Sequence, residues 1–310
     1  MNGLANWMEK YILPTAAKIG SEKHLVALRD AFISMMPATM AGAIATLLNA
    51  FMRDFPNTYL GPENAITTFF QPVIGINGIV WTGTLAIMAV VFSVSFGYNL
   101  AKAYEVDPLS GAIVSLVAFI MGIPQSASLA MKLEGTLAKD AIEVLTNSGA
   151  TVTTVDGAQT LNTAGWGYFK FSQYMGASSL FTAIIFGFIS VLIFAFLMKK
   201  NIIIKMPESV PPAVAKAFAA IIPGAVALYA SGTVYFLFEK FVGMPIIDWV
   251  SESIQKPLIG LSQGYGAVFI IVLLVHVLWF FGLHGTNIMG PVLQSVYGVA
   301  MVENTNAFQQ

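Results

Sequence analysis

Long apolar segments constrain the fold of this chain more than any other feature of its sequence. Most of them are close to the ~20 residues that a helix needs to cross the hydrocarbon core of a bilayer. A backbone in lipid must satisfy its hydrogen bonds internally, so these segments are expected to be helices. The apolar segments are 31–51, 80–101, 108–122, 177–198, 217–241 and 265–281.

The composition supports a membrane protein and argues against several other classes. Of the 310 residues, 56% are hydrophobic and 10% are charged, whereas a soluble domain averages about 25% charged residues. We therefore expect an all-α polytopic membrane protein with about six spanning helices. The net charge of −1 and the lack of a basic stripe argue against nucleic acid as a partner. The absence of cysteine excludes thiolate metal ligands and a cysteine nucleophile from these residues.

The connecting segments differ in character. Residues 1–30 form a charged amphipathic segment, which either lies on the membrane surface or packs on the protein. Residues 69–79 are apolar, but Pro72 and two glycines make them too short and too irregular to span. Residues 132–147 are expected to form a surface helix, and 148–167 a loop or hairpin.

The placement of Lys and Arg predicts the orientation of the chain in the membrane. Cytoplasmic segments carry an excess of these residues, counted mainly over short loops. With the N-terminus inside and the long 125–176 loop left out, 9 of these residues lie inside and 3 outside. The N-terminus is therefore expected to be cytoplasmic. The inside residues are Lys10, Lys18, Lys23, Arg29, Lys102, Lys199, Lys200, Lys205 and Lys216, and the outside residues are Arg53, Lys240 and Lys256.

A break after the last apolar segment carries the most suggestive polar group. The stretch HVLWFFGLHGTNIMGP, residues 276–291, places His284 between Gly282 and Gly285. A helix that breaks at membrane depth is normally tolerated only where it is buried in protein or lines a watery cavity. His284 either binds a polar solute or caps the end of the helix, and the local sequence favours neither.

Aromatic residues before the break suggest a saccharide as the solute. Indole rings stack on the apolar faces of sugars, and nearby polar groups take the hydroxyls. The sequence therefore predicts a sugar site at Trp279, His284, Thr286 and Asn287. The alternative is an interfacial aromatic belt, which Trp and Phe populate at the end of any span.

The remaining histidines have plainer interpretations, and no metal or nucleotide motif is present. His276 is expected to form a hydrogen bond between helices, and His24 is expected to be solvated. The sequence contains no HExxH motif, no Walker-type glycine loop and no GxSxG elbow. We expect no metal and no cofactor.

Several stretches resemble one family of membrane proteins. IKMPESVPPAV at 204–214, continuing to IPG at 222–224, and LWFFGLHG at 278–285 are the specific ones; LRDAFI at 28–33 and GTLAIM at 83–88 are weaker. Together they are similar to the IIC component of the bacterial sugar phosphotransferase system, of the lactose/cellobiose/diacetylchitobiose type. The resemblance covers essentially the whole chain.

This resemblance implies a function and a set of partners. Family members carry a β-linked disaccharide across the bacterial cell membrane and present its 6-hydroxyl to a phosphocysteine on a cytoplasmic IIB protein, which IIA rephosphorylates. They are homodimers. By this pattern His284 binds a sugar hydroxyl near the transferred phosphoryl group, with Trp279, Gly285 and Asn287 close by.

The resemblance also implies that the chain is the N-terminal two thirds of a protein with about ten spans. In that scheme residues 1–30 are the cytoplasmic segment, 31–242 the dimerisation part, and 243–310 the start of the substrate-binding part. The family's essential glutamate lies beyond Gln310, so no catalytic residue is assigned here, and residues 1–310 alone are expected not to transport. Thr82 departs from the asparagine that is frequent at that position.

Two other functions remain open on the sequence alone. One is a sugar carrier or channel that leaves its substrate unmodified, and the other is an inactive membrane fragment. A phosphotransferase permease would be distinguished from both by phosphorylation of the accumulated sugar and by the dependence of that phosphorylation on soluble IIB.

Overall fold

The architecture is that of a computed structural model of the chain. It describes residues 10, 14, 18, 20–133, 135–155, 158–166, 174–262, 264–280, 289, 293–298, 300, 301 and 304. The chain divides into two compact units. A helical unit comprises residues 1–122 and 172–310, and a smaller unit comprises residues 123–171.

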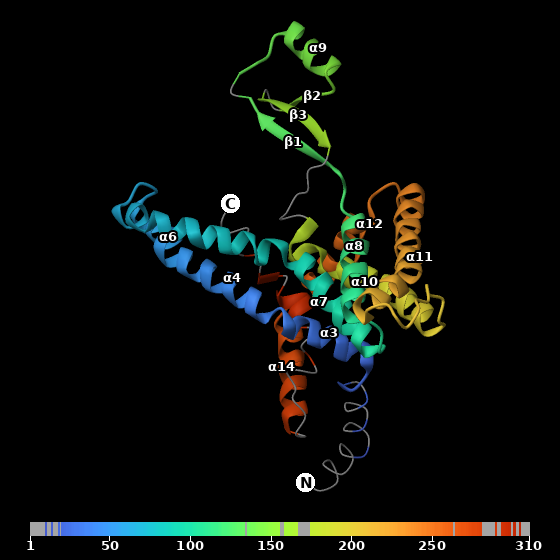
Figure 1. Ribbon diagram of the computed structural model, residues 1–310. Helices are drawn as coiled ribbons and strands as arrows, with labels where there is room; N and C mark the ends of the chain where they lie inside the picture. Colours follow the sequence, from blue (N-terminus) through green and yellow to red (C-terminus); the bar gives the residue numbers. More distant parts are fainter. Residues whose placement is uncertain are drawn as a thin grey trace. The chain divides into compact units, whose positions relative to one another are not determined.

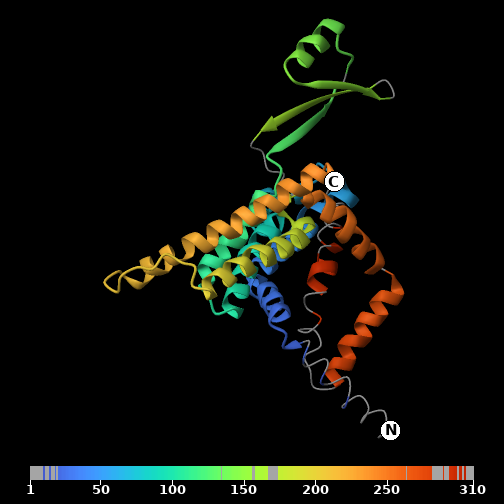
Figure 2. The same ribbon diagram turned by 90° about the vertical axis from the view of Figure 1, so that its right-hand side faces the viewer.

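Helix α7 lies at the centre of the helical unit. It runs over Met88–Ala103 and packs against α3 (Lys23–Ser34), α8 (Pro108–Met121) and α10 (Leu180–Lys199), as Figure 1 shows. Helix α11 (Pro212–Val242) runs along α10 and α8 on the outside of this group (Figure 2). Most of the fully buried aromatic side chains belong to α7, α8 and α10, including Phe92, Phe96 and Phe119.

Glycines allow the central helices to approach closely. A Cβ atom on Gly97 of α7 would lie 2.4 Å from Cβ of Ser115 and 2.6 Å from the carbonyl oxygen of Gly111. A Cβ atom on Gly187 of α10 would lie 2.6 Å from the ring of Phe96. Small residues at such contacts are the usual means by which helices associate in lipid, where apolar burial gives little drive.

Helices α4 and α6 form a long hairpin that departs from the predicted spans. Helix α4 (Met36–Asn49) continues through a π-helical turn (Ala50–Asp54) into α5 (Phe55–Leu60), and α6 (Ala65–Thr82) returns beside α4 (Figure 1). The prediction that residues 69–79 are too irregular for a spanning helix is wrong, because α6 continues through Pro72.

The predicted span at 80–101 is interrupted. Helix α6 ends at Gly83, and a 3₁₀ turn at Leu85–Ile87 precedes α7. Near the start of the chain, Met35 separates α3 from α4, and the two helical stretches meet at a 45° bend.

The last described helices form a second bent pair. Helix α12 (Ile246–Val250), a π-helical turn (Ser251–Gln255) and α13 (Lys256–Ser262) lead to α14 (Tyr265–Phe280). The bend between the two halves of this pair is 81°, the geometry of a broken span or a re-entrant loop. A π-helical segment at Leu293–Gly298 follows.

The helix lengths account for the predicted membrane spans. Within the described residues three helical stretches are long and apolar enough to cross a membrane. They are Ala65–Ala103, which comprises α6, the 3₁₀ turn and α7, and then Ala177–Lys199 and Pro212–Val242. The number rises to five if each bent pair counts as one span. Helix α8 is apolar but shorter, as the sequence predicted.

The smaller unit contains the only strands that the described residues form. Its three strands, β1 (Ser126–Lys132), β2 (Thr151–Val155) and β3 (Ala158–Trp166), pair antiparallel in the order β1-β3-β2. The predicted hairpin is confirmed as β2–β3. The predicted helix at 132–147 is too long, because α9 covers only Lys139–Asn147. The all-α description therefore applies to the helical unit.

The glycine contact at the centre of the bundle yields a test. We expect Gly97→Ala to lower the stability of the chain in detergent by about 1–3 kcal/mol, because the added methyl group overpacks the α7–α8 contact. Thermal unfolding followed by size-exclusion chromatography measures the change. The matched control is Gly75→Ala on α6, where a Cβ atom meets nothing within 4 Å. Equal effects of the two substitutions would contradict the close-contact interpretation.

Candidate functional site

Helix α14 carries two of the residues that the sequence singled out. Nδ1 of His276 lies 2.8 Å from the carbonyl oxygen of Val272, one turn earlier on the same helix. A carbonyl oxygen only accepts, so Nδ1 donates and Nε2 is left as an acceptor. His276 thus bonds within its own helix through Nδ1, and the expected hydrogen bond between helices stays a prediction for Nε2.

Trp279 lies on the same side of α14 as His276. Residues three apart are neighbours on a helix surface, and Trp279 is 48% exposed. His276 and Trp279 are thus neighbours on the surface of α14, and the exposed indole ring of Trp279 can stack on a sugar ring. His284, Gly285, Thr286 and Asn287 lie outside the described residues. Of the predicted sugar-binding residues, Trp279 is the one that the structure places.

The exposed surface of α14 is largely apolar. Phe269, Ile270, Leu273 and Leu274 are all about half exposed or more. No group of three His, Asp or Glu side chains that could hold a metal ion occurs in the described part of the chain. The chemistry available on α14 is therefore stacking and hydrogen bonding.

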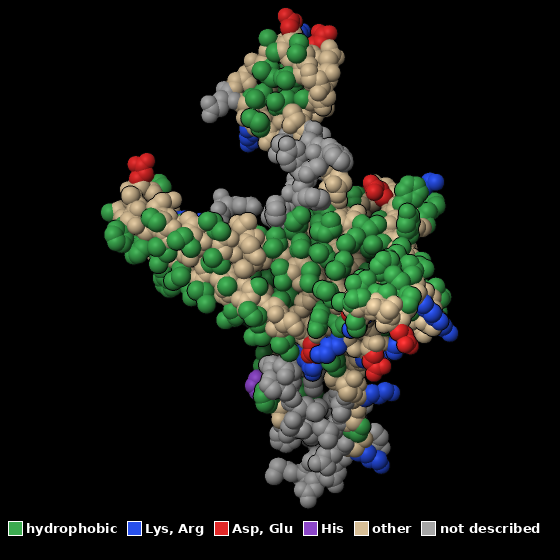
Figure 3. All heavy atoms as spheres, viewed as in Figure 1, with side chains coloured by type: hydrophobic (Ala, Val, Ile, Leu, Met, Phe, Trp, Pro, Cys, Tyr) green, Lys and Arg blue, Asp and Glu red, His purple; other side chains and the backbone are tan. Residues whose placement is uncertain are grey.

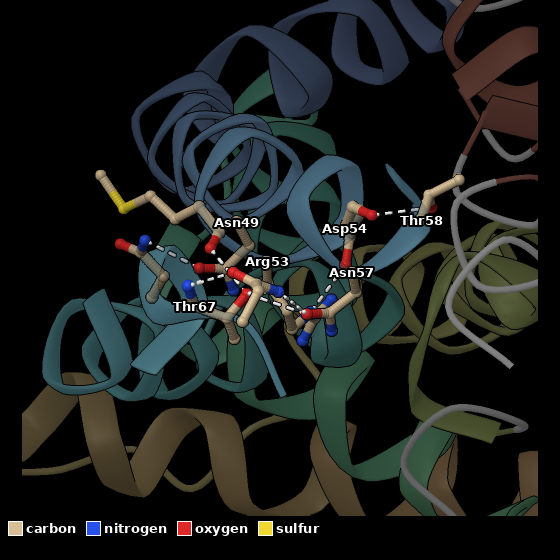
Figure 4. Close-up of polar contacts among 9 residues, drawn as sticks. Asn49, Arg53, Asp54, Asn57, Thr58 and Thr67 are labelled. Atoms are coloured by element: carbon tan, nitrogen blue, oxygen red, sulfur yellow. Dashed lines mark hydrogen bonds and ion pairs between the residues drawn. The ribbon is translucent and has the colours of Figure 1, made fainter. Parts of the chain in front are cut away.

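A pair of buried amides was not identified from the sequence. Nδ2 of Asn77 on α6 donates to Oδ1 of Asn49 on α4 over 2.9 Å, and both residues are at most 7% exposed (Figure 4). The available signal was an asparagine inside each of two apolar segments, since polar residues at membrane depth usually find a partner.

A second polar network fixes the turn between α5 and α6. Asn64 caps α6 by accepting from the backbone N–H of Thr67 over 2.8 Å, and the Thr67 hydroxyl donates to Oδ1 of Asn57 over 2.8 Å. Arg53 and Asp54 form an ion pair at 2.6 Å beside this turn (Figure 4). These groups bond to one another, so the network stabilises the hairpin tip and offers little to a ligand.

A third polar cluster joins the start of α3 to the end of α7. Nδ1 of His24 lies 2.6 Å from Glu22, and Nε2 lies 2.7 Å from the Tyr104 hydroxyl. The ammonium of Lys23 lies 3.9 Å from the centre of the Tyr104 ring. The expectation that His24 is solvated is therefore wrong, because its ring is held between these partners and the edge of Phe188.

Glu22 caps the N-terminus of α3, and its position lowers the pKa of its carboxyl group. Partial desolvation acts to raise the pKa of its carboxyl group, but N–H groups of Leu25 and His24 and the adjacent imidazole outweigh this and lower the pKa overall. The carboxylate accepts from both backbone N–H groups at 2.9–3.0 Å. A carboxylate in this position stabilises the first turn of a helix.

Comparison with known proteins gives a consistent family. Residues 29–310 match the family described as "Phosphotransferase system, EIIC". The chain is 42% identical to the cellobiose-specific EIIC component of Lactococcus lactis over all of its own length and 65% of that relative. It is 30% identical to the oligo-beta-mannoside-specific EIIC component of Bacillus subtilis, over 97% of the chain and 60% of the relative.

A solved structure resembles the fold. The crystal structure of ChbC, the IIC component of the N,N'-diacetylchitobiose-specific phosphotransferase system, aligns with a TM-score of 0.74 and 30% identity. The alignment covers 94% of this chain and 60% of ChbC. The chain thus spans between 60% and 65% of the length of these three proteins.

The buried amide pair predicts non-additive effects. We expect Asn49→Leu and Asn77→Leu each to destabilise the chain by about 1–3 kcal/mol, because each leaves one buried amide without its partner. The double substitution is expected to cost less than the sum by about 1 kcal/mol. Equilibrium unfolding in mixed micelles measures all three variants.

Asn99→Leu on α7 is the control for this cycle. The Asn99 amide donates to the Ser95 carbonyl of its own helix and is only partly buried, so its loss is expected to have little effect. Strict additivity at Asn49 and Asn77 would show that the two amides are not coupled.

Proposed function

The chain belongs to the phosphotransferase system EIIC family, and we propose that it forms membrane-embedded machinery that carries a β-linked disaccharide across the bacterial cell membrane. The sugar is presented from the cytoplasmic side to a phosphocysteine on IIB and released as its 6-phosphate. The observation that carries this proposal is the 42% identity to a cellobiose-specific EIIC component across the whole chain.

The class of sugar follows from the relatives. Two are named for cellobiose and one for oligo-beta-mannosides, while the solved structure is specific for N,N'-diacetylchitobiose. These substrates share a β-linkage between pyranose rings, and such rings expose apolar faces on which an indole can stack. We therefore assign Trp279 to contact with the sugar ring.

Hydroxyl recognition is assigned to the segment after α14. We propose that His284 binds a hydroxyl close to the site of phosphoryl transfer, with Gly285 and Asn287 beside it. The phosphoryl donor lies on IIB, which IIA serves in turn; this fits a chain without cysteine. In this scheme the chain positions the acceptor hydroxyl, whose oxygen attacks the phosphorus of the IIB phosphocysteine, and the cysteine thiolate leaves.

We propose a cytoplasmic N-terminus. Its support is that residues from three lysine-containing segments meet at one place: Lys23 and His24 at the start of α3, Tyr104 at the end of α7, and Lys199 at the end of α10. All three segments belong to the side that the Lys and Arg count assigns to the cytoplasm.

We also propose a homodimer in which the N-terminal helices supply much of the contact. The hairpin of α4 and α6 exposes large apolar side chains along its length, among them Leu47, Phe51, Phe69 and Ile76. A partner subunit or lipid must cover such a surface in the membrane.

The role of His284 can be tested in a full-length protein that contains this sequence. Inverted vesicles supplied with phosphorylated IIB and radiolabelled cellobiose are expected to yield cellobiose 6-phosphate. His284→Ala is expected to lower that rate by about 100-fold or more, because a positioned group near the reacting hydroxyl is lost. Insertion into the membrane is expected to be unchanged.

His276→Ala is the matched control. Its ring bonds to its own helix, so the rate is expected to stay within about threefold of the unaltered protein. Undiminished phosphorylation by His284→Ala would favour a helix-capping role for that residue. Accumulation of unmodified sugar without IIB would instead indicate a carrier and contradict the proposed function.

A further inference from the structure

A groove at the end of α10 combines a long apolar wall with a basic end. It has a volume of about 850 Å³ and lies between α10, α11 and the end of α7. Leu192, Phe196 and Val226 line its apolar part, and Tyr104, Lys199 and Lys200 line its polar end. We refer to this site, defined by these six residues, as the lysine groove; α10 and α11, which form its walls, run side by side in Figure 2.

The basic end of the lysine groove has no built-in counter-ion. None of the ion pairs between described residues involves Lys23, Lys199 or Lys200. Their ammonium groups lie over aromatic rings instead. Lys23 is 3.9 Å and Lys199 5.7 Å from the centre of the Tyr104 ring, and Lys200 is 5.8 Å from that of Phe196. Lys199 and Lys200 thus place two positive charges in the lining of the groove, and Lys23 adds a third charge beside Tyr104.

The acidic groups near this end are Glu22, which is paired with His24, and Glu105 and Asp107; none forms an ion pair with Lys199 or Lys200 among the described residues. Glu105 and Asp107 line an adjoining cavity that shares Lys199 with the groove. The Asp107 carboxylate accepts from the backbone N–H and the hydroxyl of Ser110 at 2.9 and 2.7 Å, and forms no ion pair with either lysine among the described residues. Lys200 does not line that adjoining cavity. Figure 3 shows Lys and Arg side chains (blue) interspersed with Asp and Glu side chains (red) below the apolar surface of the helical unit.

The apolar part has the dimensions of a lipid chain. Leu192 lies seven positions before Lys199 on α10, a rise of about 11 Å. One leaflet of the hydrocarbon core is about 15 Å deep. The wall is also exposed, since Phe196 is 59% and Val226 45% exposed. A soluble anion would leave this wall uncovered, whereas an acyl chain would cover it.

We propose that the lysine groove binds an anionic phospholipid. The phosphate and its anionic headgroup lie against Lys199 and Lys200, with Lys23 and Tyr104 behind them, and an acyl chain runs along Leu192, Phe196 and Val226. Juxtamembrane lysines attract anionic lipid in this way. The lipid would lie between α10, α11 and the end of α7, and would stabilise the contact of these helices.

Native mass spectrometry of the full chain, released from nanodiscs of equal parts phosphatidylglycerol and phosphatidylcholine, tests the proposal. We expect phosphatidylglycerol to be retained preferentially. The double substitution Lys199→Gln/Lys200→Gln is expected to reduce that preference by about fivefold or more, since each lysine near anionic lipid contributes about fivefold. Lys240→Gln is the control, because Lys240 lies at the other end of α11 over the Phe236 ring, away from the groove.

Two further arms separate a lipid from other anions. Val226→Trp leaves the charges intact but fills the apolar wall, and it is expected to reduce lipid retention while thermal unfolding in detergent stays unchanged. Millimolar inorganic phosphate is expected not to displace the lipid. Equal retention of the two lipids, an unaltered preference in the double variant, or displacement by phosphate would overturn the proposal. The last result would indicate a site for a phosphorylated group such as that of a protein partner.

Discussion

Backbone contact between glycines is the interaction on which the helical unit depends. Lipid is as apolar as a leucine side chain, so helices in a membrane gain little from burial and associate through close packing instead. Gly97 and Gly111 bring α7 against α8, and Gly187 admits the ring of Phe96. The position of α7 then fixes Tyr104 at its end, where α3 and α10 also meet. Steric fit at three glycines thus determines where the charged groups gather.

The length of the apolar segments predicted where helices form, but it did not predict where a helix breaks or continues. Residues 177–198 and 217–241 became α10 and most of α11, because long apolar runs in lipid have few alternatives to a helix. Residues 69–79 were misjudged, since Pro72 interrupts a helix in water but is accommodated in α6. The break at Gly83–Ile87 has only the weak signal of Gly83 and Thr84, because the segment is free of proline and its other residues are apolar.

Polar contacts were harder to predict than helices. His24 has charged neighbours in sequence, but its partner Tyr104 is 80 residues away, and only the tertiary fold brings them together. His276 was expected to reach another helix, and the bond that the structure shows is to Val272 of its own helix. The buried pair of Asn49 and Asn77 was missed, because local sequence does not show which polar residues of two helices face each other. For the sugar site, the pattern around Trp279 gave the residue type and the helix, and the proposed hydroxyl contacts remain with residues 284–287.

The small sheet between α8 and α10 has a consequence for experimental work on this chain. Strands β1 and β3 pair from Ser126 with Trp166 to Lys132 with Thr160, so the chain enters and leaves this unit along two neighbouring strands. A module held by such a pair can be lengthened or exchanged at its distal loops while its two entry points stay together. The loop between β1 and α9 offers an attachment point for a rigid fiducial protein, at a distance in sequence from every residue assigned to the sugar.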